Sequence, residues 1–121
     1  MIQKYIYGDP IETDAVIKEI PVSKGNPSYG TISTQDGFSF TYIMQPEDIV
    51  YGLGEANRGI NKRGYLYRAW NSDDPSHTED KHSLYASHNL LIFSGECGQF
   101  GAFFDDPGAV TFDLGYTDSS K

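Results

Sequence analysis

Basic residues, cysteines and long apolar runs are all scarce in this sequence. Its 121 residues include 9 Lys and Arg against 17 Asp and Glu, so the formal net charge is −8. Such a surface repels phosphate backbones, and we expect no nucleic-acid partner. The one cysteine, Cys97, excludes an internal disulfide framework and a multi-cysteine zinc site. No apolar run approaches the roughly 20 residues of a membrane helix, and the first residues lack a secretory signal. We therefore expect no membrane partner and a cytoplasmic location.

Aromatic residues, glycine and proline are abundant instead. Aromatic residues make up 14% of the chain, which also has 13 Gly and 6 Pro. Aromatic side chains suit half-buried pleated surfaces, whereas Gly and Pro mark turns. A chain of this length holds one domain, so we expect a single all-β domain over residues 1–121.

Alternation of large side chains predicts several strands. In residues 37–44 the large side chains fall on every second position, which indicates a strand with one buried side. Residues 89–94 are continuously apolar, as expected of a strand covered on both faces, and form a predicted hairpin with 99–104. Residues 13–20 fit either helix or strand, and we favour a strand. The predicted strands are 37–44, 48–53, 64–70, 89–94, 99–104 and 109–114, and their regular spacing predicts an antiparallel β-sandwich.

The longest segment without a strand pattern runs from residue 71 to residue 83. A loop of this length in a compact domain suggests a function. Asp73 and Asp74 are adjacent and would point to opposite sides, so we do not expect them to flank one bond as a catalytic pair. Either could accept hydrogen bonds from a hydroxylated ligand, although a plain surface turn explains them as well.

Other candidate groups in this region have ordinary explanations. The two histidines His77 and His82 are five residues apart, which fits no compact metal-ligand spacing, and we expect a solvated polar loop without a metal. Trp70 would serve either as a stacking platform for a sugar or as a buried core residue. Gly52 and Gly54 lack the helix that follows a dinucleotide fingerprint, so they indicate a bend at a strand end. We therefore expect no cofactor, and the residues themselves reveal no catalytic group.

Five short motifs in fixed order carry a family resemblance. They are Tyr51-Gly-Leu-Gly-Glu55, Asn57-Arg-Gly59, Trp70-Asn-Ser-Asp73, Leu84-Tyr-Ala-Ser-His88 and Gly101-Ala-Phe-Phe-Asp-Asp-Pro107. Together they resemble the N-terminal β-sandwich of glycoside hydrolase family 31, the α-glucosidase and α-xylosidase family. The resemblance runs from about Tyr5 to Tyr116. Residues 51–64 and 78–81 are most similar to the short α-glucosidases of gut Firmicutes.

The resemblance implies a galactose-mutarotase-like sandwich that belongs to a larger enzyme. Family members are retaining α-glycosidases whose two catalytic aspartates lie on a (β/α)8 barrel after this domain. No residue here matches either aspartate, so we expect this segment alone to be inactive. The resemblance also implies that the segment stops before the last strands of its sandwich. Its partners would be the downstream barrel and an oligosaccharide with terminal α-linked glucose, and no cofactor is implied.

The resemblance also implies a role for Asp73. In the family a loop marked by Trp-Asn-Thr-Asp, with Leu-Tyr about ten residues later, reaches over the barrel mouth and lends an aspartate to the sugar pocket. Here the matching residues are Trp70 to Asp73 and Leu84-Tyr85, with Ser72 in place of Thr and a second carboxylate, Asp74, next to Asp73. We therefore expect Asp73 to bind substrate hydroxyls.

Two other functions remain open at this point. A stand-alone carbohydrate-binding module would need an exposed aromatic platform of its own. A structural interaction domain would expose a strand edge or an apolar face, and in isolation it could form a homodimer.

Overall fold

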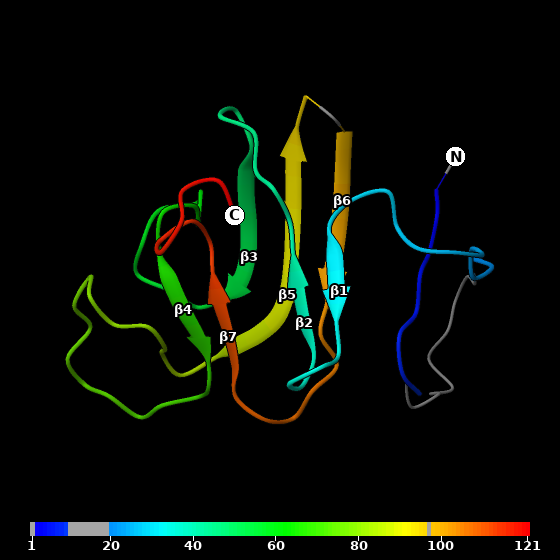
Figure 1. The fold of residues 1–121 in the computed structure, drawn as a ribbon. Coiled ribbons are helices and arrows are strands. Elements are labelled where there is room, and N and C mark those ends of the chain that lie inside the picture. The colour runs from blue at the N-terminus through cyan, green and yellow to red at the C-terminus, as the bar shows by residue number, and fades with distance from the viewer. Residues whose placement is uncertain (1, 10–19, 97) are drawn as a thin grey trace.

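The described part of the chain is built from β-strands. A computed structural model describes residues 2–9, 20–96 and 98–121 (Figure 1). Its strands are β1 (Thr31–Ser33), β2 (Ser39–Thr41), β3 (Ile49–Gly54), β4 (Leu66–Ala69), β5 (Ser87–Gly95), β6 (Gly98–Phe103) and β7 (Val110–Asp113). These described residues contain no helix, and hence no apolar helix of membrane-spanning length.

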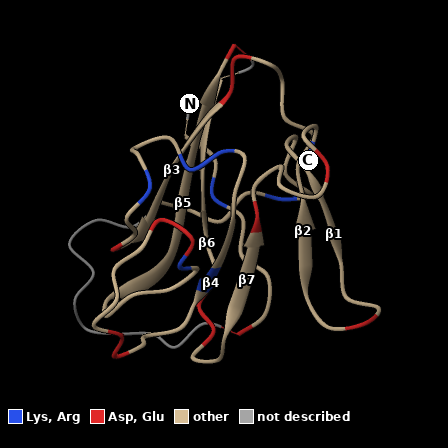
Figure 2. Cartoon of the chain, turned by 90° about the vertical axis from the view of Figure 1, so that its left-hand side faces the viewer, with Lys and Arg blue, Asp and Glu red and all other residues tan. Residues whose placement is uncertain are grey.

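The strands form two layers, which Figure 2 shows from the side. One layer is a three-stranded antiparallel sheet in the order β3-β5-β6. The facing layer consists of two antiparallel ribbons, β4 with β7 and β1 with β2 (Figure 1). The antiparallel β-sandwich predicted from the sequence is therefore confirmed.

The core lies between the three-stranded sheet and the two ribbons. Aromatic rings join the layers: Phe40 of β2 meets Phe100 of β6 edge to face with ring centroids 6.1 Å apart, and Phe104, just after β6, meets Phe112 of β7 edge to face at 5.5 Å. Such aromatic pairs prefer stacked or edge-to-face arrangements, and they stabilise the core beyond the burial of their apolar area. The buried core residues are Met44, Val50, Leu53, Tyr67, Ala69, Leu91, Phe93, Phe112 and Leu114.

Most of the predicted strands are confirmed, although their bounds differ. Those predicted at 48–53, 64–70 and 109–114 correspond to β3, β4 and β7, and the predicted hairpin is the antiparallel pair β5 and β6. The strand predicted at 37–44 is only three residues long, and Phe38 at its start is exposed. Strand β1 was not predicted, because three residues are too few to show a period of two. Residues 13–19 and Cys97 lie outside the described residues.

The prediction that residues 89–94 are covered on both faces is wrong for the described structure. Leu91 and Phe93 are 2% and 6% exposed, whereas Leu90 and Ile92 are 39% and 45% exposed. The reason is that the ribbons pack on one side of the three-stranded sheet only. An apolar run in sequence therefore conceals a normal strand alternation in the structure.

A bulge at Gly52 and Leu53 bends the end of β3. The pairing of β3 with β5 shifts between Gly52 and Gly54. Gly52 has φ 123°, and a Cβ there would collide with the carbonyl oxygen of Leu90. Leu53 follows at φ 69°, an uncommon backbone conformation for a residue other than glycine, with its side chain buried. The expected bend at this strand end is thus confirmed as a β-bulge, which directs the chain toward the loop between β4 and β5.

Candidate functional site

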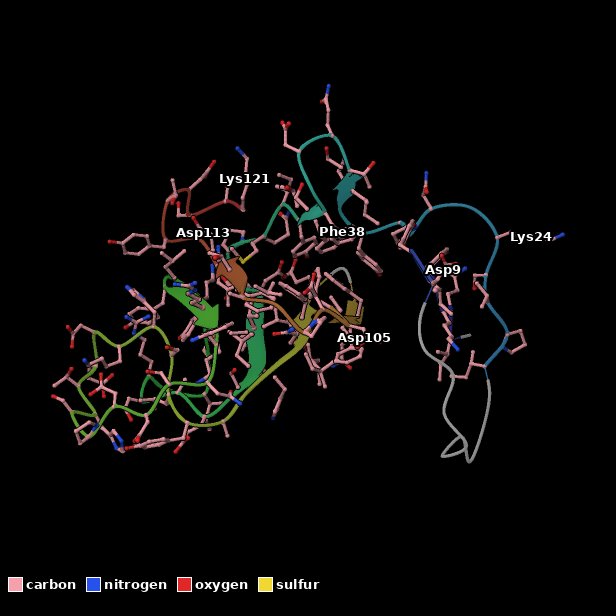
Figure 3. The ribbon with its side chains drawn as sticks, turned by 90° about the horizontal axis from the view of Figure 1, so that it is seen from below. Asp9, Lys24, Phe38, Asp105, Asp113 and Lys121 are labelled. Carbon is pink, nitrogen blue, oxygen red and sulfur yellow. The ribbon has the colours of Figure 1, made fainter. Side chains whose placement is uncertain are left out.

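The candidate site is the loop of residues 70–86 between β4 and β5, called here the β4–β5 loop. It extends to one side of the sandwich in Figure 1, and Figure 3 shows it from below. The described residues of this loop contain no strand, as predicted for 71–83. Asp73, the expected substrate-binding residue, lies on it and is exposed.

Arg58 braces this loop from the preceding connection. Its Nε donates a hydrogen bond of 2.8 Å to the carbonyl oxygen of Glu79, and its Nη1 donates one of 3.1 Å to the carbonyl oxygen of Leu66. The guanidinium carbon lies 4.3 Å from the ring centroid of Tyr65, a cation–π contact. One planar side chain therefore joins the loop to the start of β4.

Hydrogen bonds also hold the two ends of the loop together. The backbone N–H of Ser72 donates to the carbonyl oxygen of Leu84 at 3.0 Å. The backbone N–H and the hydroxyl of Ser87 both donate to Oδ1 of Asn71 at 2.9 Å. The loop therefore has a closed base, and the exposed Asp73 directly follows Ser72 in that base.

Asp74 is fully engaged inside the loop. Its Oδ2 pairs with Nζ of Lys81 at 2.5 Å, and its Oδ1 accepts a hydrogen bond from the backbone N–H of Ser76 at 2.9 Å. The hydroxyl of Tyr85 donates to its carbonyl oxygen at 3.0 Å. The hydrogen bond from Lys81 is the main reason that the pKa of Asp74 lies below its usual value, and the same contact raises the pKa of Lys81. Asp74 thus has a structural role in this loop.

Asp73 differs from its neighbour in this respect. Its carboxylate makes no hydrogen bond or ion pair with any described residue, and it is more exposed than Asp74. An ionised carboxylate with both oxygens available can accept two hydroxyl groups of a ligand. Of the two adjacent carboxylates, Asp73 is therefore the one that the loop leaves available.

The two histidines of the loop have separate partners. The ring of His77 meets the ring of Tyr85 edge to face at 5.2 Å, whereas Nδ1 of His82 lies 2.8 Å from the carbonyl oxygen of Leu66. Among the described residues, no three His, Cys, Asp or Glu side chains gather as a metal site would require.

Trp70 lies on the surface at the base of the loop. It is 53% exposed, so the alternative that it belongs to the core is wrong. It lines a groove of about 300 Å³. The groove is formed by Ala69, Trp70, Asn71, Ser87, His88, Asn89, Asp106, Pro107 and Gly108.

Sequence reasoning missed the residues that support the loop. Arg58 belongs to the Asn57-Arg-Gly59 motif, which was noticed as a family marker without any structural role. Lys81 lies seven residues from Asp74, and no local spacing rule pairs residues at that distance in an irregular segment. An excess of acidic residues around one lysine was the only available signal.

Comparison with known proteins gives one family and several relatives. The family model of the glycosyl hydrolase 31 N-terminal galactose mutarotase-like domain matches residues 18–113. Alpha-glucosidase 2 of Bacillus thermoamyloliquefaciens is 33% identical over 87 residues, which cover 64% of this chain and 11% of that protein.

Solved structures give the same result. A mutant GH31 dextranase of Flavobacterium johnsoniae complexed with isomaltotriose matches with a TM-score of 0.64 and 27% identity over 74% of this chain. The same dextranase complexed with glucose matches with a TM-score of 0.63 and 27% identity over 73% of this chain. The chain spans 11% of the length of each of these proteins.

Proposed function

Because the chain belongs to the N-terminal galactose-mutarotase-like domain of glycosyl hydrolase family 31, we propose that it is part of a retaining α-glucosidase. The parent enzyme would remove terminal α-linked glucose from oligosaccharides through a glycosyl-enzyme intermediate. Both catalytic aspartates would lie on a (β/α)8 barrel downstream, so this segment alone would have no activity. The relatives named as an α-glucosidase and as a dextranase support a glucoside substrate.

The observation that carries the proposal is the contrast between Asp73 and Asp74. Lys81 and Ser76 hold the carboxylate of Asp74, while that of Asp73 is exposed and without a partner among the described residues. Asp73 would accept hydrogen bonds from substrate hydroxyls and orient the sugar while the barrel performs the chemistry. The closed base of the β4–β5 loop provides the fixed position that such orientation requires.

The outer face of the three-stranded sheet would contact the rest of the parent chain. Cross-strand pairing places Tyr51 beside Ile92 and Leu90 beside Phe103, with Ile49 on the same face. Leu90, Ile92, Phe103 and Ile49 are all exposed in the described structure. A contiguous apolar face of this kind marks an interface, and the matched part of this chain covers only 11% of each relative. The downstream part of the parent is therefore the proposed occupant.

A substitution on this outer face tests that contact. Ile92→Asp should lower the melting temperature of the full-length parent and leave that of the 121-residue chain nearly unchanged, because Ile92 is 45% exposed there. An equal effect in both would contradict the proposed contact. If the 121-residue chain is a dimer in sedimentation and Ile92→Asp makes it monomeric without affecting the parent, a second copy is the occupant instead.

The activity itself is tested with the full-length parent. The parent should hydrolyse maltose and isomaltose, and from an aryl α-glucoside it should release glucose first as the α-anomer, observed by ¹H NMR during the first minutes, because a retaining mechanism preserves the configuration. The 121-residue chain should release none. A parent that produces the β-anomer first, or hydrolyses neither sugar, would refute the proposal. The alternative is that the domain binds carbohydrate independently of the catalytic part. In that case, deletion of residues 1–121 should leave the hydrolysis of a small aryl α-glucoside unchanged.

A further inference from the structure

The two ribbons of the facing layer have unpaired strand edges that face each other. Among the described strands, β7 is paired with β4 alone and β2 with β1 alone. Figures 1 and 2 both show the order β4, β7, β2, β1 across this layer, so the unpaired edge of β7 faces that of β2. Such an edge presents a row of backbone N–H and C=O groups that can bind another strand.

The hydrogen bonds of β7 show which of its backbone groups face this edge. The N–H of Leu114, just after β7, donates to the carbonyl oxygen of Tyr65 at 3.0 Å, on the side of β4. Backbone groups of successive residues in a strand point alternately to its two sides. The N–H and C=O of Phe112 therefore face β4, whereas those of Thr111 face β2 and have no backbone partner among the described residues.

The outer edges of β3 and β4, in contrast, are covered within the described chain. The N–H of Arg68, the register partner of Thr111, points away from β7 and donates to the carbonyl oxygen of His82 at 2.9 Å. The carbonyl oxygen of Val50 in β3 accepts a hydrogen bond of 2.7 Å from the N–H of Lys62. At these two edges a connecting segment takes the place of a further strand, but between β7 and β2 none of the described connections does so.

The last described residues lead toward these two edges. The N–H of Met44, three residues after the end of β2, donates to the carbonyl oxygen of Ser120 at 2.8 Å. The N–H of Lys121 donates to the carbonyl oxygen of Asp118 at 3.0 Å, the hydrogen bond of a β-turn, which reverses the chain after β7. In Figure 1 the C-terminus lies above the arrowheads of β7 and β2. A chain that continued in this direction would run back between the two ribbons.

The side chains beside the two edges define the kind of strand that fits. The ring centroid of Phe104 lies 6.4 Å from that of Phe40 in β2 and 5.5 Å from that of Phe112 in β7, so one ring contacts both ribbons from the core side. Phe40 and Phe104 are only half-buried, and the outward side chains of Thr41 and Thr111 are exposed. A strand between the ribbons would therefore place apolar side chains against Phe104 and polar ones outside.

We propose that the residues of the parent chain directly after Lys121 form a strand between β2 and β7. This strand runs antiparallel to both, because β2 and β7 point the same way and the turn at Asp118 reverses the chain. It joins the two ribbons into one five-stranded sheet in the order β4, β7, new strand, β2, β1. The inference rests on the proposed function only in requiring that the chain continues into a longer parent.

Amide hydrogen exchange of the full-length parent, resolved to single residues by mass spectrometry, tests this inference. The amide of Thr111 should exchange at least about a hundredfold more slowly in the parent than in an unstructured peptide. In the 121-residue chain the same amide should exchange almost as fast as in such a peptide. Phe112 is the matched control, because its N–H faces β4 and should be protected in both proteins. Successive amides of the segment directly after Lys121 should also be protected, since an internal strand bonds to a neighbour on each side.

Three outcomes would overturn the inference. The first is a parent in which Thr111 exchanges freely while Phe112 is protected. The second is a parent in which the segment directly after Lys121 exchanges freely. The third is a 121-residue chain in which Thr111 is protected in proportion to a dimer seen in sedimentation, because a second copy would then occupy the edge. None of these measurements involves a sugar, so a parent without glucosidase activity but with a protected Thr111 would refute the proposed function and support this inference.

Discussion

Leu53 offers a direct test of how the bulge in β3 balances strain against burial. Its backbone has φ 69° and its side chain is 4% exposed, so the residue combines a strained conformation with full burial. The matched control is Leu91, which is 2% exposed and sits in the regular ladder of β5 opposite Gly52 and Ala102. Both side chains belong to the same core.

The expected magnitudes follow from three contributions. Truncation of a buried leucine to alanine costs about 3 kcal/mol at either position. Glycine in place of alanine costs a further ~0.5–1 kcal/mol in an ordinary strand, because the unfolded chain gains freedom. At a left-handed φ, glycine instead recovers about 1–2 kcal/mol of backbone strain. At Leu91 the glycine variant should therefore be less stable than the alanine variant by nearly 1 kcal/mol. At Leu53 the glycine variant should be more stable than the alanine variant by roughly the same amount.

Urea unfolding of the 121-residue chain, followed by far-UV circular dichroism, measures these differences. Four variants are needed, with alanine and with glycine at each position. The reasoning requires the sign of the glycine-minus-alanine difference to reverse between Leu53 and Leu91. The reasoning would be refuted if the glycine variant were less stable than the alanine variant by the same amount at both positions.

Two further predictions concern close packing and pH. Gly95→Ala should destabilise the chain by about 1–3 kcal/mol in urea unfolding, because the new Cβ would collide with Oδ1 of the buried Asp48; Gly101→Ala, whose Cβ would lie 3.7 Å from the nearest atom, should be nearly neutral. The pKa of Asp74 is lowered in the folded chain, so its ion pair with Lys81 is fully present above the unfolded pKa of about 3.9 and is lost as the pH falls through the folded pKa. Amide exchange measured by NMR should therefore show faster opening of residues 72–83 in acid, and already at neutral pH in Lys81→Met; equal protection in all three cases would contradict the role of the pair.

Short-range signals in the sequence were sufficient to predict most of the sheet. Alternation at 64–70 predicted that Tyr67 and Ala69 share one face of the strand, because a period of two follows directly from strand geometry, and the structure buries that face of β4. The inference that a continuous apolar run is covered on both faces failed for Leu90 and Ile92, since their exposure depends on whether a second layer covers that face, which no local pattern records.

Only part of the candidate site could be predicted from the sequence. The motif Trp70 to Asp73 located the loop and singled out Asp73 through the family resemblance. That Asp74 is held within the loop could not be predicted, because Lys81 reaches it across an irregular segment. The role of Arg58 likewise depends on three-dimensional contacts with Glu79 and Leu66. Long-range polar contacts of this kind follow from the folded backbone and not from periodicity.

Kinetics of the full-length parent test the central claim most directly. Asp73→Ala should lower kcat/KM for maltose at least about tenfold, equivalent to roughly 1.4 kcal/mol for a lost hydrogen bond to a charged group. The melting temperature should not change, because Asp73 has no partner among the described residues, and Asp36→Ala, at another exposed aspartate, should behave like the wild type. An Asp73→Ala enzyme with wild-type kcat/KM would remove Asp73 from the sugar pocket and contradict the account.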